Sequence, residues 1–137
     1  MKAESNIKPS NKMTIEKRES RTIVGLYDLS NIVEEEKDEE TIYIYNYYEV
    51  VIEDREVTDK DYDRLLEAAR ETEYNLLAKT IRDKRDKLLA NTDWSMMADV
   101  TMEEQKRESY RTYRQALRDI TKQEDFPYSV IFPILEV

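Results

Sequence analysis

The sequence contains no cysteine, no histidine and a single glycine among its 137 residues. Without cysteine there is no disulfide and no thiolate nucleophile, and without histidine there is no Ser-His-Asp triad; zinc sites built on thiolate or imidazole are excluded as well. One glycine is too few for the glycine-rich loops that hold phosphate groups. The 31 Asp and Glu residues guarantee chance carboxylate pairs, so such pairs do not indicate glycoside hydrolysis. We therefore expect a protein that is not an enzyme, with no catalytic residues, no metal site and no cofactor.

Long apolar runs are also missing. The first twenty residues have no apolar stretch typical of a signal peptide, and no segment is apolar enough to cross a membrane. We expect a protein that is made and kept in the cytoplasm and has no membrane partner.

Charge is abundant but unevenly distributed. Charged residues make up 39% of the chain, above the usual ~25%, and the net charge is −9. Residues 23–56 contain eleven acidic and two basic residues, whereas residues 1–22 contain three acidic and six basic ones. An acidic protein of this kind is a poor nucleic-acid binder, because phosphates require a cationic surface. We interpret residues 1–21 as a flexible basic leader.

Residues 22–57 predict a small β-region of an α+β fold, either an antiparallel sheet or a hairpin. Thr22–Leu29 reads as a short strand and Thr41–Glu53, rich in Tyr, Ile and Val, as a long one. In the long strand the even-numbered residues form the expected core face and the odd-numbered residues an amphipathic face. Between the two strands, residues 33–40 form a like-charge run that predicts a solvated acidic loop.

Residues 58–121 predict a helical region that ends in an αα-hairpin. Thr58 and Asp61 suit the start of a long helix, and apolar residues follow at helical spacing. The apolar stripe drifts after Glu73, so we expect the helix to bend or break near residues 71–74. A second helix, expected to open near Thr101, packs against the first. Two prolines make residues 122–137 an extended, Pro-containing tail.

Two stretches suggest a structural lock between these helices: "RDKLLANTDW", ending at Trp94, and "YRTYRQALRDI". We expect Trp94 to be buried against the second helix, and arginine forks to pair with aspartates across the hairpin. A solvated face with weak ion pairs is the plainer alternative. The predicted lock comprises Arg82, Arg85, Asp86, Leu88, Leu89, Asp93, Trp94, Tyr113, Leu117, Arg118 and Asp119. The expected cross-hairpin pairs join Arg82, Arg85 or Arg118 to Asp119, Asp86 or Asp83.

The same stretches resemble the C-terminal module of phage tail assembly chaperone proteins, also found in relatives of tail-fibre assembly proteins. The similarity runs from about residue 79 to residue 133 and follows the order R-x-x-R-[DN]-x-L-L-x-x-[ST]-D-W, a linker, Y-R-x-x-L-R-D and a Pro-containing tail. The family often has Trp-Pro where this chain has Phe132-Pro133, and its linker is usually richer in Pro and Leu. The residues that carry the resemblance are Arg82, Arg85, Asp86, Leu88, Leu89, Thr92, Asp93, Trp94, Tyr113, Arg114, Leu117, Arg118, Asp119, Phe126-Pro127 and Phe132-Pro133.

The resemblance implies a non-enzymatic phage protein that binds another tail or fibre protein and assists its folding or attachment. It would act in the host cytoplasm during assembly, with retention in the virion as a structural subunit as the alternative. Its own oligomeric state stays open. Apolar and aromatic residues are the expected contact surface. The candidates are Tyr43, Tyr45, Tyr47, Phe126, Tyr128, Val130, Phe132 and Pro133, although the tyrosines could equally form a second core face under the long helix.

Overall fold

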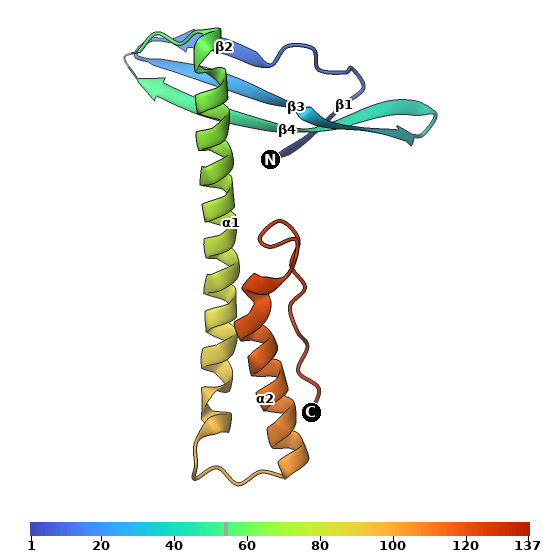
Figure 1. Ribbon diagram of the computed structural model, residues 1–137, viewed down its shortest axis with the longest axis vertical. Coiled ribbons are helices and arrows are strands. Elements are labelled where there is room, and N and C mark those ends of the chain that lie inside the picture. Colours follow the sequence, from blue (N-terminus) through green and yellow to red (C-terminus); the bar gives the residue numbers. More distant parts are fainter. Residues whose placement is uncertain (54) are drawn as a thin grey trace. The chain divides into compact units, whose positions relative to one another are not determined.

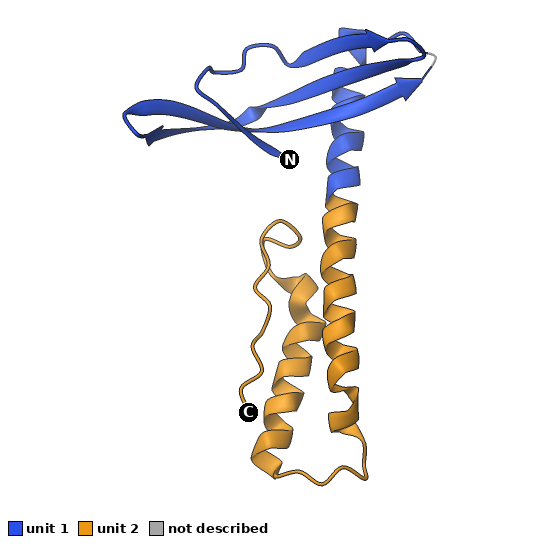
Figure 2. Ribbon diagram, turned by 180° about the vertical axis from the view of Figure 1, so that it is seen from behind, with its two compact units in different colours: residues 1–73 blue, residues 74–137 orange. Residues whose placement is uncertain are grey.

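The computed structural model describes residues 1–53 and 55–137 and has the predicted α+β architecture. The chain divides into two compact units, Met1–Glu73 and Tyr74–Val137, coloured separately in Figure 2. A four-stranded antiparallel sheet lies in the first unit, and a helical hairpin lies in the second.

The sheet consists of β1 (Lys2–Ser5), β2 (Met13–Arg18), β3 (Arg21–Lys37) and β4 (Glu40–Glu53). The strands lie in the order β1-β4-β3-β2, so the two long strands occupy the centre (Figure 1). Their register is regular except for an irregularity in β3 between Asp28 and Val33. β3 and β4 are therefore the framework, and the short N-terminal strands flank them.

The expected leader of residues 1–21 is part of this sheet, which differs from the prediction. β1 pairs with Tyr43–Asn46 of β4, and β2 pairs with Arg21–Leu26 of β3. Neither short strand has a strong apolar alternation of its own, and all of β2 except Met13 is exposed. Their pairing depends on neighbours distant in the sequence, which is why local composition did not indicate it.

The expected acidic loop of residues 33–40 is also strand. Lys37 of β3 faces Glu40 of β4, and the turn between them is only two residues long. Asp38 and Glu39 have positive φ values of 52° and 65°, the sign that type I′ hairpin turns require. The acidic side chains of the ribbon are exposed, so they remain solvated while their backbones pair.

One face of the sheet holds the core of the first unit. Val24 and Leu26 of β3 pack with Val57 and with residues from the start of the long helix, and Tyr48, Val50 and Ile52 of β4 pack against this cluster. The even-numbered face of β4 is thus the core face, as predicted. The core residues contributed by the helix are Tyr62, Leu65 and Leu66.

A buried carboxylate connects this helix to the irregular part of β3. Asp28 accepts hydrogen bonds from the backbone N–H and hydroxyl of Ser30, at 3.1 and 2.5 Å, and pairs with the Arg70 guanidinium at 2.6 Å. The Tyr62 hydroxyl donates to the Tyr27 carbonyl, at 2.6 Å. Asp28 therefore organises the bulge in β3 and also holds the helix against the sheet.

The helices begin after the sheet. A 3-10 turn, η1 (Asp59–Asp61), leads into α1 (Tyr62–Thr92), and the Thr58 N–H donates to the Asp61 carboxylate at 3.0 Å. The break expected near residues 71–74 is absent, because α1 is one continuous helix. The apolar stripe along α1 drifts because the helix is buried in two different units. Leu65 and Leu66 are buried in the first unit, whereas Ala78 is buried in the second.

The second unit contains the rest of α1, η2 (Asp93–Met96), α2 (Glu104–Arg118) and η3 (Asp119–Lys122). The two helices run in opposite directions as the predicted hairpin, and the C-terminal segment runs back alongside α2 (Figure 1). α2 begins at Glu104, three residues after the expected Thr101. Within residues 1–53 and 55–137, no helix is long and apolar enough to span a membrane.

The Asp28 anchor predicts a dependence of stability on pH. Burial opposes ionisation of Asp28, but the hydrogen bonds from Arg70 and Ser30 outweigh it and lower the carboxyl pKa below its usual value. A lowered folded-state pKa adds stability above the unfolded-state pKa of about 3.9, and this contribution is lost as pH falls through the folded pKa. Asp28→Asn should therefore weaken the loss of unfolding free energy between neutral and acidic pH, measured by urea denaturation. Glu71→Gln, which removes an exposed carboxylate of α1, should keep the wild-type pH profile; identical profiles for the two variants would contradict the anchor.

Candidate functional site

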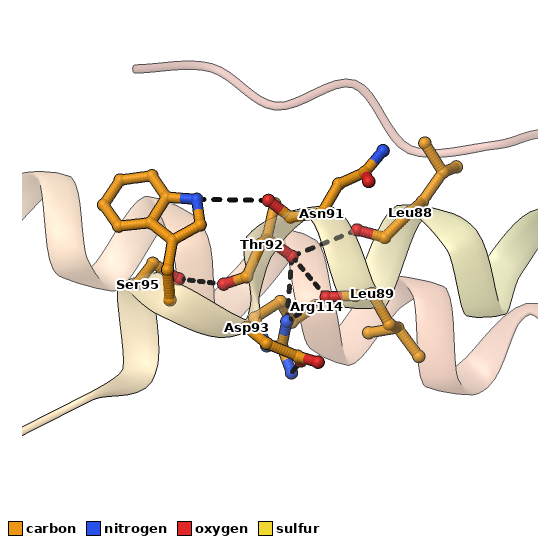
Figure 3. Close-up of polar contacts among 8 residues, drawn as sticks. Leu88, Leu89, Asn91, Thr92, Asp93, Ser95 and Arg114 are labelled. Atoms are coloured by element: carbon orange, nitrogen blue, oxygen red, sulfur yellow. Dashed lines mark hydrogen bonds and ion pairs between the residues drawn. The ribbon is translucent and has the colours of Figure 1, made fainter.

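The helical hairpin is closed by the guanidinium of Arg114. From α2, its Nη1 donates to the Leu89 carbonyl at 2.7 Å and to the Thr92 hydroxyl at 2.8 Å, and its Nη2 pairs with the Asp93 carboxylate at 2.7 Å (Figure 3). The side chain is buried, although the Asp93 carboxylate is largely exposed. Arg114 thus binds three groups at and just after the C-terminal end of α1, where helix carbonyls have no intrahelical partner.

Two hydroxyls complete this helix end. Thr92 donates to the carbonyls of Leu88 and Leu89, at 3.2 and 3.1 Å, and the fully buried Ser95 donates to the Thr92 carbonyl at 2.6 Å. Figure 3 shows these bonds converging with those of Arg114. The turn after α1 is therefore fixed by polar side chains. Within the described part of the chain, the Nε of Arg114 is a buried donor without a hydrogen-bond partner.

The predicted lock residues do not form the expected ion pairs. Arg85 pairs with its neighbour Asp86 at 2.8 Å, and Asp119 pairs with Lys122 at 2.7 Å. Those partners lie on the same helix or turn, so the pairs do not join the helices. The charged contact that does cross the hairpin is Arg114–Asp93. Of the other predicted members, Leu117 is fully buried, Leu88, Leu89 and Tyr113 are half-buried, and Arg82 and Arg118 are exposed.

The prediction that Trp94 is buried is wrong. Its side chain is 45% exposed, its ring lies edge-on to Tyr110 of α2 at 5.4 Å, and its indole N–H donates to the Asn91 carbonyl. The buried apolar residues that follow α1 in the chain are instead Tyr110, Leu117 and Ile120. Trp94 follows the end of α1 closely and contacts the second helix. Because it lies in the short η2 turn, one side of its ring remains in solvent.

Sequence reasoning did not assign the central roles of Arg114, Thr92 and Ser95. Arg114 stands within "YRQALR" and Thr92 within "NTDW", so both were visible in the resemblance but not as partners. The available signal was the arginine of the second motif together with the Thr-Asp pair at the end of the first, which the structure brings together. The Leu89 and Thr92 carbonyls that accept from Arg114 and Ser95 are backbone groups without a side-chain signature, so the sequence did not indicate these bonds.

The C-terminal segment presents one side to the helices. The Arg82 guanidinium lies 5.6 Å from the Phe126 ring centre, and the Lys84 ammonium lies 4.1 Å from the ring centre of Phe132. The Gln123 side chain donates to the carbonyl of Ile131 and accepts from its N–H, at 2.8 and 2.9 Å. These contacts hold the segment in place from Phe126 to Phe132. The prediction of an extended tail over residues 122–137 is wrong for its first part, because η3 ends at Lys122 and residues 124–128 form a turn.

Four apolar residues of the segment are exposed, and we define them as the apolar ridge: Tyr128, whose ring also lies edge-on to Tyr74 of α1 at 6.3 Å, Ile131, Ile134 and Val137. These residues recur at every third position and are 61%, 79%, 84% and 72% exposed. The structure thus divides the predicted tail residues: Tyr128 belongs to the ridge, whereas Phe126, Val130, Phe132 and Pro133 are half-buried.

The tyrosine face belongs to the first unit and lies opposite the core. Tyr27 of β3 pairs across the strands with Tyr47 and lies 4.8 Å from its ring centre and 5.9 Å from that of Tyr45. The alternative of a second core face under the long helix is wrong, since α1 packs on the even-numbered face. Burial first, and then the hydrogen bond to Glu49, raises the pKa of Tyr47 to about 12. Tyr43, on the same face, is half-buried.

The single glycine lies beneath this face. A Cβ at Gly25 would come within 2.5 Å of the Thr14 hydroxyl oxygen, 2.8 Å of the Tyr47 hydroxyl oxygen and 3.1 Å of the Tyr47 ring. Gly25 therefore lets the Tyr47 side chain lie across β3.

Comparison with known proteins agrees with the C-terminal geometry. Residues 78–135 match the family described as phage tail assembly chaperone protein, which confirms the resemblance. The matched region is less than half of the chain and lies within the second unit. It contains the whole Arg114 network, so the residues that close the hairpin lie in the region similar to phage tail assembly chaperone proteins. No curated protein and no solved structure matches the chain.

Metal chemistry has no support in the described part of the chain, where no three acidic side chains gather closely enough to hold a metal ion. The carboxylates whose pKa is lowered are instead held by structural partners: Arg70 at Asp28, the Thr58 N–H at Asp61 and Lys122 at Asp119. What the site offers is a fixed hairpin with an apolar ridge, which suits protein binding.

Gly25→Ala should lower the unfolding free energy by about 1–3 kcal/mol, because the added methyl group overpacks the space under Tyr47. In an ordinary strand the same change would stabilise by roughly 0.5–1 kcal/mol. Urea denaturation of Gly25→Ala with and without Tyr47→Ala gives a double-mutant cycle, in which the cost should shrink once the ring is removed. A neutral or stabilising Gly25→Ala would contradict the close packing.

Arg114→Met should lower the unfolding free energy by about 3–5 kcal/mol, because it leaves the end of α1 with unpaired polar groups. Arg118→Met is the matched control: the same substitution one helical turn later, at an exposed side chain, should change stability by less than about 0.5 kcal/mol. Denaturation followed by helical circular dichroism measures both. Equal effects would show that Arg114 does not close the hairpin.

Proposed function

We propose that this protein is a phage tail assembly chaperone that binds another tail or tail-fibre protein and assists its folding or attachment. The observation that carries the proposal is the match of residues 78–135 to the family, on a unit whose apolar ridge is exposed. The proposed place of action is the host cytoplasm during assembly. The proposal includes no enzymatic activity, no nucleic-acid partner and no membrane.

The ridge has the physical properties of a contact surface. Exposed apolar side chains close together along one segment favour association, because their burial removes apolar area from water. The contacts of Phe126 and Phe132 and the Gln123 clamp already order the backbone that carries the ridge. A partner therefore binds a surface that has lost much of its conformational freedom, which favours affinity.

Charge distribution supports the second unit as the binding part. Residues 74–137 contain eleven basic and eleven acidic residues, whereas residues 1–73 contain eleven basic and twenty acidic ones. The net charge of −9 is thus carried by the first unit. The acidic surface of the first unit improves solubility and repels acidic proteins. In a chaperone whose apolar ridge lies on the second unit, which has no net charge, partner contacts are therefore directed to that unit.

A virion structural subunit is the second candidate. It is favoured by the tyrosine face, a further aromatic surface on the other unit, because a subunit within a particle contacts several neighbours. The protein composition of purified particles separates the two functions. Stoichiometric presence in the particle supports the structural subunit, and absence supports the transient chaperone.

The direct experiment is co-expression of the tagged protein with each tail and tail-fibre protein of the same phage, followed by capture. The wild type should retain one of them, and Ile131→Ser/Ile134→Ser should reduce the retained amount at least about tenfold, since each apolar side chain contributes roughly 1.5–3 kcal/mol when buried. The unfolding transition should stay unchanged, because both side chains are exposed.

Leu76→Ser/Met97→Ser is the matched control. It removes two exposed apolar side chains from the same unit away from the ridge and should capture as well as the wild type. Failure of the wild type to retain any tail or fibre protein would refute the proposed function. Full capture by the ridge variant would show that the partner binds elsewhere.

A further inference from the structure

A hollow of about 360 Å³ lies beside the ridge, between α2 and the C-terminal segment. Tyr113 and Ala116 of α2 form its apolar side, and Pro133 and Ile134 form part of the opposite wall. Its volume falls in the range of ligand sites, which begins near 300 Å³. The hollow therefore admits a side chain with its immediate neighbours, and Ile134 belongs to both the hollow and the ridge.

The charged residues at the hollow are all of one sign. Glu108 on α2 and Glu136 on the C-terminal segment line it, and no lysine or arginine does. One carboxylate oxygen of Glu108 forms an ion pair with the Arg111 guanidinium at 3.2 Å. Glu136 forms no ion pair with any described residue. The remaining lining residues are neutral and polar, with hydroxyl or amide groups. An apolar wall next to two carboxylates fits an occupant with both an apolar stem and a positive end.

We infer that this hollow receives a lysine or arginine side chain, flanked by apolar residues, from the protein that the chaperone binds. The long side chain lies along Tyr113 and Ala116, and its charged end reaches Glu108 and Glu136. The apolar neighbours of that residue then meet the ridge through Ile134. The inference rests on the proposed function, because it specifies the partner chemistry of the same unit.

Charge complementarity separates this occupant from the other options. An acidic or phosphorylated segment would bring like charges within a few ångströms of Glu108 and Glu136, which is unfavourable. A purely apolar segment would bury the Glu136 carboxylate without a partner, which costs free energy. A basic residue between apolar ones satisfies both parts of the hollow.

The first experiment titrates the full chain with a short acetylated peptide that has one arginine between two leucines, followed by amide chemical shifts. The control peptide carries citrulline, the neutral analogue of arginine. Shifts around Glu108, Ala116 and Glu136, with citrulline binding at least about threefold more weakly, are expected. Equal binding of the two peptides, or shifts confined to the acidic β3–β4 ribbon, would overturn the inference.

Variants locate the site. Glu108→Gln/Glu136→Gln should weaken the arginine peptide at least about threefold and leave the citrulline peptide unchanged. Glu35→Gln/Glu36→Gln removes the same charge from the β3–β4 ribbon and should have no effect. Ala116→Trp fills the hollow and should abolish peptide binding, whereas Ala90→Trp, at an exposed alanine of α1, should not. Retained binding in Ala116→Trp would place the peptide elsewhere.

Capture of the tail protein distinguishes this inference from the function on which it rests. If the wild type and Ala90→Trp capture a tail or fibre protein and Ala116→Trp does not, the hollow takes part in partner binding. If all three capture it equally, the inference fails and the chaperone function stands. If none captures a tail protein while the arginine peptide still occupies the hollow, the function fails and the basic-apolar specificity of the hollow stands.

Discussion

The structure depends on one long helix that serves two units. The first turns of α1 bury Tyr62, Leu65 and Leu66 against the sheet, and its later turns bury Ala78 within the helical hairpin. A chain with only 39% hydrophobic residues has little apolar surface for two cores. Each part of α1 therefore contributes a different apolar stripe, and neither stripe would stabilise a helix of this length by itself.

Buried polar groups complete both small cores. Asp28 joins the irregular part of β3 to Arg70, and Arg114 joins α2 to the end of α1. Both interactions combine an ionic contact with hydrogen bonds to neighbouring groups, which is what makes a buried charge tolerable. The ends and irregularities of the main elements are thus fixed by directional contacts, where apolar packing alone would leave the geometry loosely determined.

The C-terminal segment contains some residues that attach it to its unit and other, apolar residues that stay exposed. This division explains how a small protein keeps an exposed apolar surface. Phe132 beneath Lys84 and Gln123 bonded to Ile131 hold the segment to its own unit. The ridge residues remain exposed, and the hollow beside Ile134 is lined by two carboxylates, those of Glu108 and Glu136. The residues that attach the segment to its unit are thus different from the apolar residues that it leaves exposed.

Sequence alone determined the element types that depend on local pattern. The alternation in β4, with Val50 and Ile52 on the core face, and the helical spacing through α1 both follow from side-chain direction, which is a property of the local backbone. The order of short motifs from Arg82 to Phe132-Pro133 likewise determined the family resemblance. Tertiary structure decided what depends on distant partners: the pairing of β1 and β2, the continuation of β3 and β4 through residues 33–40, and the exposure of Trp94. It also decided that Arg114 is the arginine that crosses the hairpin, because the Leu89 carbonyl, the Thr92 hydroxyl and the Asp93 carboxylate converge on its guanidinium only when the chain has folded.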